Sequence, residues 1–266
     1  MSQPLTDAIN ALTTYANTVT GASDTTLSDA VATLASGYGG GYSIADVLAG
    51  DFEENMDLTG ITTITRPYIF QNSTVKTIYA PDLTSVIDHT FFNAKNLETV
   101  NVPLLANGAE YGFAGCSKLT TLIHPYVFSL GQRSFEGCSS LPIFVGNPTG
   151  TYTNTFNGCS SLEALDFGDR FSATRATSFN NCKVLTVVII RATTMPALAN
   201  ISMFNGTPFA SGKAGGTLYV PSDLISSYQS ATNWSTILGY PNNQILAIEG
   251  SYYETHYADG TEIPTE

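Results

Sequence analysis

Charged residues are scarce in this chain. They make up 12% of its 266 residues, about half the share of an ordinary soluble protein. Twenty-two acidic residues outnumber ten basic ones, which gives a formal net charge of −12. A nucleic-acid surface needs a stripe of Lys and Arg to neutralise phosphates, whereas the basic residues here are scattered singly. We therefore expect no nucleic-acid partner, and neutral polar residues must keep the surface soluble.

Residues that carry catalysis are also few. The chain has three histidines, at positions 89, 124 and 256, and it has no Gly-x-Ser-x-Gly, His-Glu-x-x-His or phosphate-loop motif. His124 stands where neighbouring repeats have apolar residues, which indicates a structural role. Two carboxylates that meet in space for glycoside cleavage stay open as an alternative. The sequence predicts a protein that is not an enzyme and that needs no cofactor.

Long apolar stretches are missing as well. No run of 18 apolar residues occurs, so we expect no membrane-spanning helix. The segment Met1–Asp7 lacks the basic start of a secretion signal, and alternating apolar and polar residues follow it. We therefore expect no signal peptide.

The chain does contain an internal repeat of about 22 residues. Its anchor residues are 22, 22, 22, 21 and 23 residues apart: Ile69, Phe91, Phe113, Phe135, Phe156 and Phe179. Leu or Val follows six residues after each anchor, and an apolar residue follows nine after it. A unit of this size cannot bury its own apolar face, so successive units must stack on one continuous core. The sequence predicts a solenoid.

The repeats resemble those of a known family. Phe113-Ala-Gly-Cys-Ser-Lys-Leu119 and Phe135-Glu-Gly-Cys-Ser-Ser-Leu141 are similar to BspA-type leucine-rich repeats, which occur on bacterial surface proteins and in some bacteriophage proteins. The resemblance covers roughly residues 60–250. It implies a mainly β fold, a leucine-rich-repeat solenoid with a short α-helical N-terminal module and a capped C-terminus. It implies little about the ligand, because repeat surfaces vary with their partners.

All four cysteines stand three residues after an anchor, at positions 116, 138, 159 and 182. A side chain that recurs at one repeat position must point the same way in each unit, and Ala94 fills the same position one unit earlier. We expect a buried column of free thiols, with neither disulfides nor a zinc site.

Residues 1–41 form a separate module in this interpretation. Apolar residues recur at helical spacing on two short stretches separated by Gly21, and glycines at 37 and 39–41 supply a flexible joint. The expected attachment or oligomerisation residues are Leu5, Ile9, Leu12, Val19, Leu27, Val31 and Leu34. Short amphipathic helices need a partner to pack on. We expect either a homo-oligomer or a simple cap on the first repeat.

This leader, residues 12–41, is similar to leaders of bacteriophage and prophage structural proteins. The resemblance implies that it anchors the protein to a virion head or tail.

Residues 42–68 are predicted to be an N-terminal cap. Acidic residues gather there at 46, 51, 53, 54 and 57. Their spacing lacks the Asp-x-Asp-x-Asp-Gly order of a calcium loop. We interpret them as the hydrated side of a capping helix, and we expect no metal.

The repeats are predicted to span 69–215 and a C-terminal cap to span 216–250. In that cap Thr217–Pro221 favours a strand, Ser222 an N-cap, Asp223–Ser230 a short helix, and Ile245–Ile248 a last strand. Trp234, the one tryptophan, is expected in the core. The acidic, tyrosine-containing tail, 251–266, is too short and polar to fold alone, and it either covers an apolar face or extends into solvent.

Strand alternation locates a candidate binding face. If the residue nine after each anchor points inward, those eight and ten after it point outward. The candidate binding residues are Tyr79, Asn101, Ile123, Ile143, Val145, Asp166, Val187 and Ile189. The early rungs are polar, and five apolar residues at 123, 143, 145, 187 and 189 form a patch that something should cover. We expect another subunit, a virion protein or the tail to lie there.

Together these features favour a noncatalytic bacteriophage virion protein, either structural or decorating, that displays its repeats to other virion proteins or to a host cell-surface molecule. The expected location is the virion. The alternative is a bacterial cell-surface adhesin or a secreted protein-interaction module.

Overall fold

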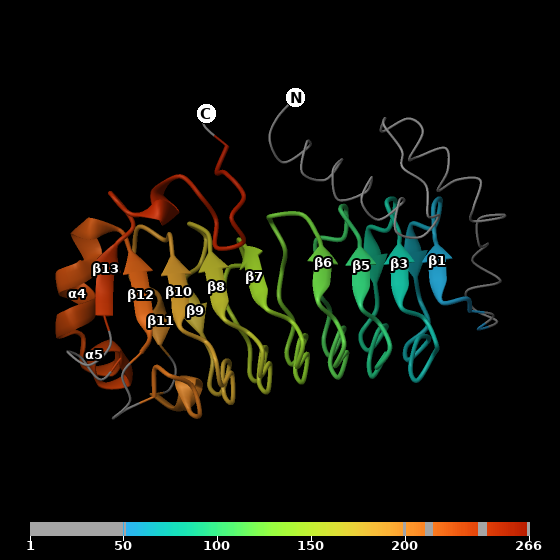
Figure 1. Ribbon diagram of the computed structural model, residues 1–266, viewed down its shortest axis with the longest axis horizontal. Coiled ribbons are helices and arrows are strands. Elements are labelled where there is room, and N and C mark those ends of the chain that lie inside the picture. Colours follow the sequence, from blue (N-terminus) through green and yellow to red (C-terminus); the bar gives the residue numbers. More distant parts are fainter. Residues whose placement is uncertain (1–49, 51, 199–200, 211–214, 239–243, 265–266) are drawn as a thin grey trace.

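The computed structural model describes residues 50, 52–198, 201–210, 215–238 and 244–264. Within these residues the chain is a solenoid of about seven turns, with short parallel strands stacked side by side (Figure 1). The predicted attachment residues at 5, 9, 12, 19, 27, 31 and 34 lie outside the described residues.

Two parallel sheets form the long flank of the solenoid. The first has the order β1-β3-β5-β6, and the second has the order β13-β12-β10-β8-β7. The strands of the first sheet are β1 (Asn55–Asp57), β3 (Thr77–Tyr79), β5 (Thr99–Asn101) and β6 (Thr121–Ile123). Those of the second are β7 (Ile143–Gly146), β8 (Ala164–Phe167), β10 (Val187–Ile190), β12 (Thr217–Val220) and β13 (Gln244–Ala247).

A shorter parallel stack forms a second flank. It consists of β2 (Thr63–Ile64) with β4 (Ser85–Val86), and β9 (Ala173–Thr174) with β11 (Ala197–Leu198). Isolated bridges continue it at Asn107–Ser129 and Gly150–Ala173. The mainly β solenoid with repeats of about 22 residues, predicted from the sequence, is confirmed.

Pro142 explains why the long flank is divided between β6 and β7. In the same column, the main-chain N–H groups of Glu98, Thr120 and Glu163 each donate to a carbonyl of the preceding turn, at 2.7, 2.9 and 2.8 Å. A proline at this position has no N–H to donate to Thr120, so the ladder is interrupted there.

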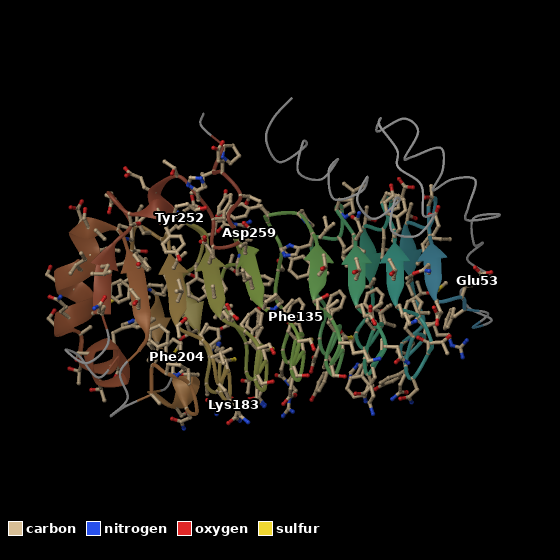
Figure 2. The ribbon with its side chains drawn as sticks, in the orientation of Figure 1. Glu53, Phe135, Lys183, Phe204, Tyr252 and Asp259 are labelled. Atoms are coloured by element: carbon tan, nitrogen blue, oxygen red, sulfur yellow. The ribbon has the colours of Figure 1, made fainter. Side chains whose placement is uncertain are left out.

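A ladder of phenylalanines fills the interior (Figure 2). Neighbouring rings have centroids 4.8 to 6.1 Å apart along the ladder. Its members are Phe70, Phe91, Phe113, Phe135, Phe156, Phe179 and Phe204, all buried. The sequence predicted Ile69 as the first anchor, but the structure places Phe70 there. The reason is that one residue fewer separates the anchor from the strand in that turn. The amide of Tyr68, two residues before it, donates to the carbonyl of His89, which confirms this register.

The four cysteines line one buried column, as predicted, and all are free thiols. Each thiol donates to the carbonyl of the anchor phenylalanine one turn earlier, as from Cys116 to Phe91 at 3.0 Å and from Cys138 to Phe113 at 3.1 Å. Burial raises the pKa of Cys116 and Cys182 to about 12, so these thiols stay protonated. The column satisfies main-chain acceptors inside the core.

The acidic segment before the repeats does not form a capping helix where it is described. Asn55–Asp57 is strand β1, which pairs in parallel with β3 at an offset of 22 residues. Met56 points inward in the column of Ile78 and Val100 and is 1% exposed. Packing of this apolar residue in the strand column makes the segment the first described rung of the solenoid.

The C-terminal cap contains the predicted strands, helix and buried tryptophan. A 3-10 turn η2 (Ser222–Leu224) leads into helix α4 (Ile225–Ser230), and α5 (Thr232–Leu238) follows. Trp234 is buried and its indole N–H donates to the carbonyl of Pro196 at 3.2 Å. Ser222 is not the predicted N-cap. It lies inside the 3-10 turn, and its amide donates to Glu249 at 2.8 Å.

Two further 3-10 turns, η1 (Ile201–Phe204) and η3 (Tyr252–Glu254), complete the described elements. The segment after η3 runs back along the carboxyl ends of β12, β10 and β8 toward β7 (red in Figure 1). No helix in the described parts of the chain is long and apolar enough to cross a bilayer.

Candidate functional site

The outward side of the long flank is the candidate site, and we call it the strand face. Its two columns follow from the register of the strands. One column contains Asp57, Tyr79, Asn101 and Ile123 in the first sheet and Val145, Asp166, Ile189 and Tyr219 in the second. The other contains Asn55, Thr77, Thr99 and Thr121, then Ile143, Ala164, Val187 and Thr217. The predicted binding residues therefore lie on one face.

The N-terminal half of the strand face is polar and half-exposed. Tyr79 lies between Asp57 and Asn101 in the column, and burial, followed by the charges of Asp57 and Asp82, raises the pKa of its phenol. The amide oxygen of Asn101 is buried and has no hydrogen-bond partner among the described residues. A partly exposed tyrosine beside a partly exposed amide side chain is able to bind both apolar and polar groups of a ligand.

In the C-terminal half of the strand face, residues 251–264, which we call the tail, cover the column of Asp166, Ile189 and Tyr219. Ile189 is 0% exposed, and the tail contacts both of its neighbours in the column, Asp166 and Tyr219. The other apolar residues of the predicted patch, at 123, 143, 145 and 187, are half-buried. Another subunit, a virion protein or the tail was expected to cover this patch. In the structure the tail lies against it.

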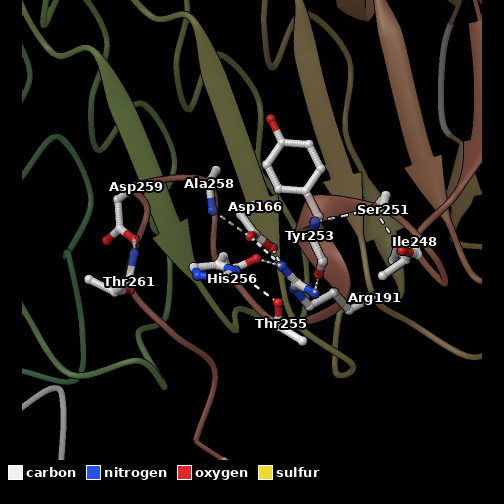
Figure 3. A network of polar contacts seen from close by, with 10 residues as sticks. All are labelled: Asp166, Arg191, Ile248, Ser251, Tyr253, Thr255, His256, Ala258, Asp259 and Thr261. Atoms are coloured by element: carbon white, nitrogen blue, oxygen red, sulfur yellow. Dashed lines mark hydrogen bonds and ion pairs between the residues drawn. The ribbon is translucent and has the colours of Figure 1, made fainter.

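A buried ion pair anchors the tail (Figure 3). The guanidinium of Arg191 donates from Nε to Asp166 Oδ1 at 2.8 Å and from Nη2 to Asp166 Oδ2 at 2.7 Å. The Asp166 side chain is 0% exposed and that of Arg191 is 13% exposed. Burial raises the pKa of the Asp166 carboxyl, and the contact with Arg191 opposes that shift. We call these two residues the Asp166–Arg191 clamp.

Sequence reasoning located Asp166 on this face and named the tyrosine-containing tail as one possible cover, but it missed Arg191, Tyr126 and Tyr219. Tyr126, Tyr219, Tyr253 and Tyr257 complete the cluster. One signal was available, since Arg191 directly follows the apolar strand β10 and stands 25 residues after Asp166. An acid and a base about one repeat apart at the same end of adjacent strands come together in a parallel stack.

His124 is packed in the wall and does not line a site. Its ring stacks on Phe144 with centroids 5.3 Å apart, and Nδ1 lies 2.8 Å from the carbonyl oxygen of Pro125. Burial lowers the pKa of His124 to about 4. Among the described residues, no group of three or more His, Cys, Asp or Glu side chains is gathered as a metal site would require.

The repeats match a protein-family model, described as BspA type leucine rich repeat region, in six copies over residues 62–186 and 151–206. No curated protein matches the chain.

Several solved structures are similar to it. A leucine-rich repeat protein from Bacteroides ovatus ATCC 8483 is 23% identical over 51% of this chain, with a TM-score of 0.41, and the match spans 38% of that protein. The T. pallidum leucine rich repeat protein is 16% identical over 73% of this chain and 92% of its own length, with a TM-score of 0.39. A leucine rich cell surface protein from Faecalibacterium prausnitzii A2-165 is 13% identical over 80% of this chain and 82% of its own length, with a TM-score of 0.28.

Proposed function

We propose that this chain, which belongs to the BspA-type leucine-rich-repeat family, is a noncatalytic interaction protein that binds a partner protein on the N-terminal half of its strand face. The observation that carries this proposal is the register of Asp57, Tyr79 and Asn101, which stand side by side on consecutive rungs. Stacked repeats present such residues as one extended surface, which suits a macromolecular partner.

The physical chemistry of this half supports a protein partner. Tyrosine is enriched among residues that dominate binding energy, because it offers a large rigid surface with a polar end. Asn101, which is partly exposed on the next rung, has side-chain N–H groups that a partner carbonyl can accept from. The flanking threonines of the second column add hydroxyl groups without charge.

Selection of binders from a displayed peptide library on the immobilised full chain tests the proposal. We expect Tyr79→Ala combined with Asn101→Ala to weaken the selected binders at least about tenfold, the usual effect of removing an interface anchor. The matched control is Tyr152→Ala, which removes a tyrosine that is 48% exposed and lies outside the strands of the strand face, directly before the turn that begins at Thr153. Binders that tolerate the double variant, or that are lost in the control, contradict the proposal.

The wider setting is a second part of the proposal. We propose display of the repeats on a virion, with other virion proteins or a host cell-surface molecule as partners, and with attachment through residues 1–41. Support for this comes from the leader sequence alone, and the family match and the solved structures do not add to it. A bacterial cell-surface or secreted interaction module is the alternative.

Light scattering on the full chain and on a version lacking residues 1–41 tests the attachment module. We expect an oligomer for the full chain and a monomer for the shortened one, because amphipathic helices of this length need a partner to pack on. If both are monomers, the leader does not assemble the protein, and the alternative gains support.

A further inference from the structure

The tail is held to the solenoid mainly through its main chain. Arg191 donates from Nη1 to the carbonyl of Tyr253 at 2.8 Å and from Nη2 to the carbonyl of His256 at 3.0 Å. The amide of Ala258 donates to Asp166 Oδ2 at 3.0 Å. The clamp therefore binds two main-chain carbonyls and one main-chain N–H of the tail (Figure 3). Because these groups belong to the backbone, the clamp recognises the backbone conformation of the tail more than its side chains.

Two tyrosines of the tail add contacts that depend on side chains. The ring of Tyr257 lies over the Arg191 guanidinium at 5.2 Å and packs against the ring of Tyr126, with centroids 5.1 Å apart. Tyr253 meets Tyr219 edge to face at 4.7 Å. Such ring contacts are stronger when they are partly desolvated, as they are here. They give the clamp a preference for an aromatic residue next to the bound carbonyls.

The clamp is assembled by the solenoid itself. Asp166 lies in strand β8 and Arg191 directly follows the adjacent strand β10, where its amide donates to the carbonyl of Phe167 at 2.9 Å. Their bidentate pairing involves no atom of the tail. The binding geometry is thus set by the repeat register.

The tail is likewise ordered by its own contacts. The amide of Tyr257 donates to Thr261 and that of Ile263 donates to Thr255, both at 2.8 Å, which closes a small hairpin. Asp259 stabilises its turn by accepting from the amide of Thr261 at 3.0 Å. A single exposed turn at Gly250, which has a φ of 76°, joins the hairpin to β13.

We propose that the Asp166–Arg191 clamp is a polypeptide-binding site for the C-terminal hairpin of a second copy of this chain, and that a single chain fills it with its own hairpin. This goes beyond the proposed function, because it concerns the other half of the strand face and a different ligand. Attachment through a short turn gives the cis hairpin an effective concentration on the order of millimolar, so it occupies the clamp in an isolated chain. Reciprocal exchange between two copies makes a closed, symmetric dimer.

The first experiment separates the hairpin from the clamp after folding. A protease recognition sequence is inserted after Gly250 in the full chain, the folded protein is cut, and a fluorescent peptide of residues 251–266 is added. We expect the peptide to replace the cut hairpin and to bind saturably. Failure of the peptide to bind at millimolar concentration overturns the proposal.

Variants identify where the peptide binds. We expect Tyr257→Ala in the peptide alone, which leaves the solenoid unchanged, to weaken binding at least about tenfold. Arg191→Lys in the protein should do the same, because lysine cannot keep the bidentate ion pair and bind both carbonyls. Arg133→Lys is the control, since Arg133 also pairs with an acid, Glu136, and lies over a tyrosine, Tyr111, without contacting the tail. Equal binding by all variants overturns the assignment.

The second experiment tests the second copy. Gly250 has a φ of 76°, which proline cannot adopt, so Gly250→Pro in the uncut chain prevents the hairpin from folding back. We expect this variant to have twice the mass of the wild type in light scattering, with Gly250→Asn as a control that keeps the wild-type mass because asparagine tolerates positive φ. An unchanged mass for Gly250→Pro overturns the exchange.

Discussion

At the scale of single residues, the buried cysteine thiols are hydrogen-bonded to the backbone of a neighbouring turn. The thiols of the cysteine column show the pattern, since each donates to a carbonyl 24 to 26 residues earlier. His124 differs from the thiols because it contacts the carbonyl of the next residue, Pro125, and burial lowers its pKa to about 4.

His124 makes stability depend on pH. Its folded pKa of about 4 lies below the unfolded value of 6.5, so the unfolded chain binds more protons between these values and the free energy of unfolding falls as pH falls from 6.5 to 4. The loss is up to about 3 kcal/mol at 1.36 kcal/mol per pKa unit. Urea unfolding of the wild type and His124→Phe across this range measures it. We expect the variant to lack this component, because Phe167 shows that the position in a repeat accepts phenylalanine, and parallel curves for both proteins would contradict the prediction.

At the scale of the repeat element, each turn is stabilised by the turns on either side of it. Phe135 stacks on Phe113 with centroids 5.3 Å apart and on Phe156 at 5.4 Å. It has no exposed surface. Each ring of the aromatic ladder therefore depends for its packing on the rings of the turns before and after it.

Removal of one ladder ring should show this dependence. We expect Phe135→Ala to lower the free energy of unfolding by about 3–5 kcal/mol, because it leaves a cavity between two fixed rings. Phe92→Ala, at a half-exposed position on the same turn surface as Tyr68, should cost clearly less. Chemical denaturation followed by circular dichroism measures both. If Phe135→Ala lowered the free energy of unfolding by less than about 1 kcal/mol, the ladder would not be a main source of core stability.

At the scale of the whole molecule, the solenoid is a linear stack in which most packing joins adjacent turns. Both sheets of the long flank are parallel, with partners 22 residues apart between β1 and β3 (Asn55 and Thr77) and 21 apart between β7 and β8 (Ile143 and Ala164), and the interruption at Pro142 leaves the phenylalanine ladder continuous. Stability in such a stack is close to a sum of units and their interfaces.

Lengthening the stack by one unit tests this description. A second copy of residues 113–134 inserted before Phe135 restores the register of every column, so we expect a folded protein whose β signal in circular dichroism rises and whose Tm is unchanged or higher. Insertion of residues 113–123 alone should prevent folding of the stack, because half a turn places inward residues outside. Aggregation of the first variant, or cooperative folding of the second, would contradict the model.

Sequence alone determined the period, the parallel β solenoid, the inward columns, the free thiols and the strand face, because these features repeat and each unit meets its neighbours at a fixed offset. Tertiary structure decided the first anchor at Phe70, the strand at Asn55–Asp57 and the path of the tail. The hydrogen bonds that fix the tail join residues 62, 65 and 92 positions apart. Contacts of this range have no periodic pattern in the sequence, so only the folded chain shows that Arg191 and Asp166 hold the tail.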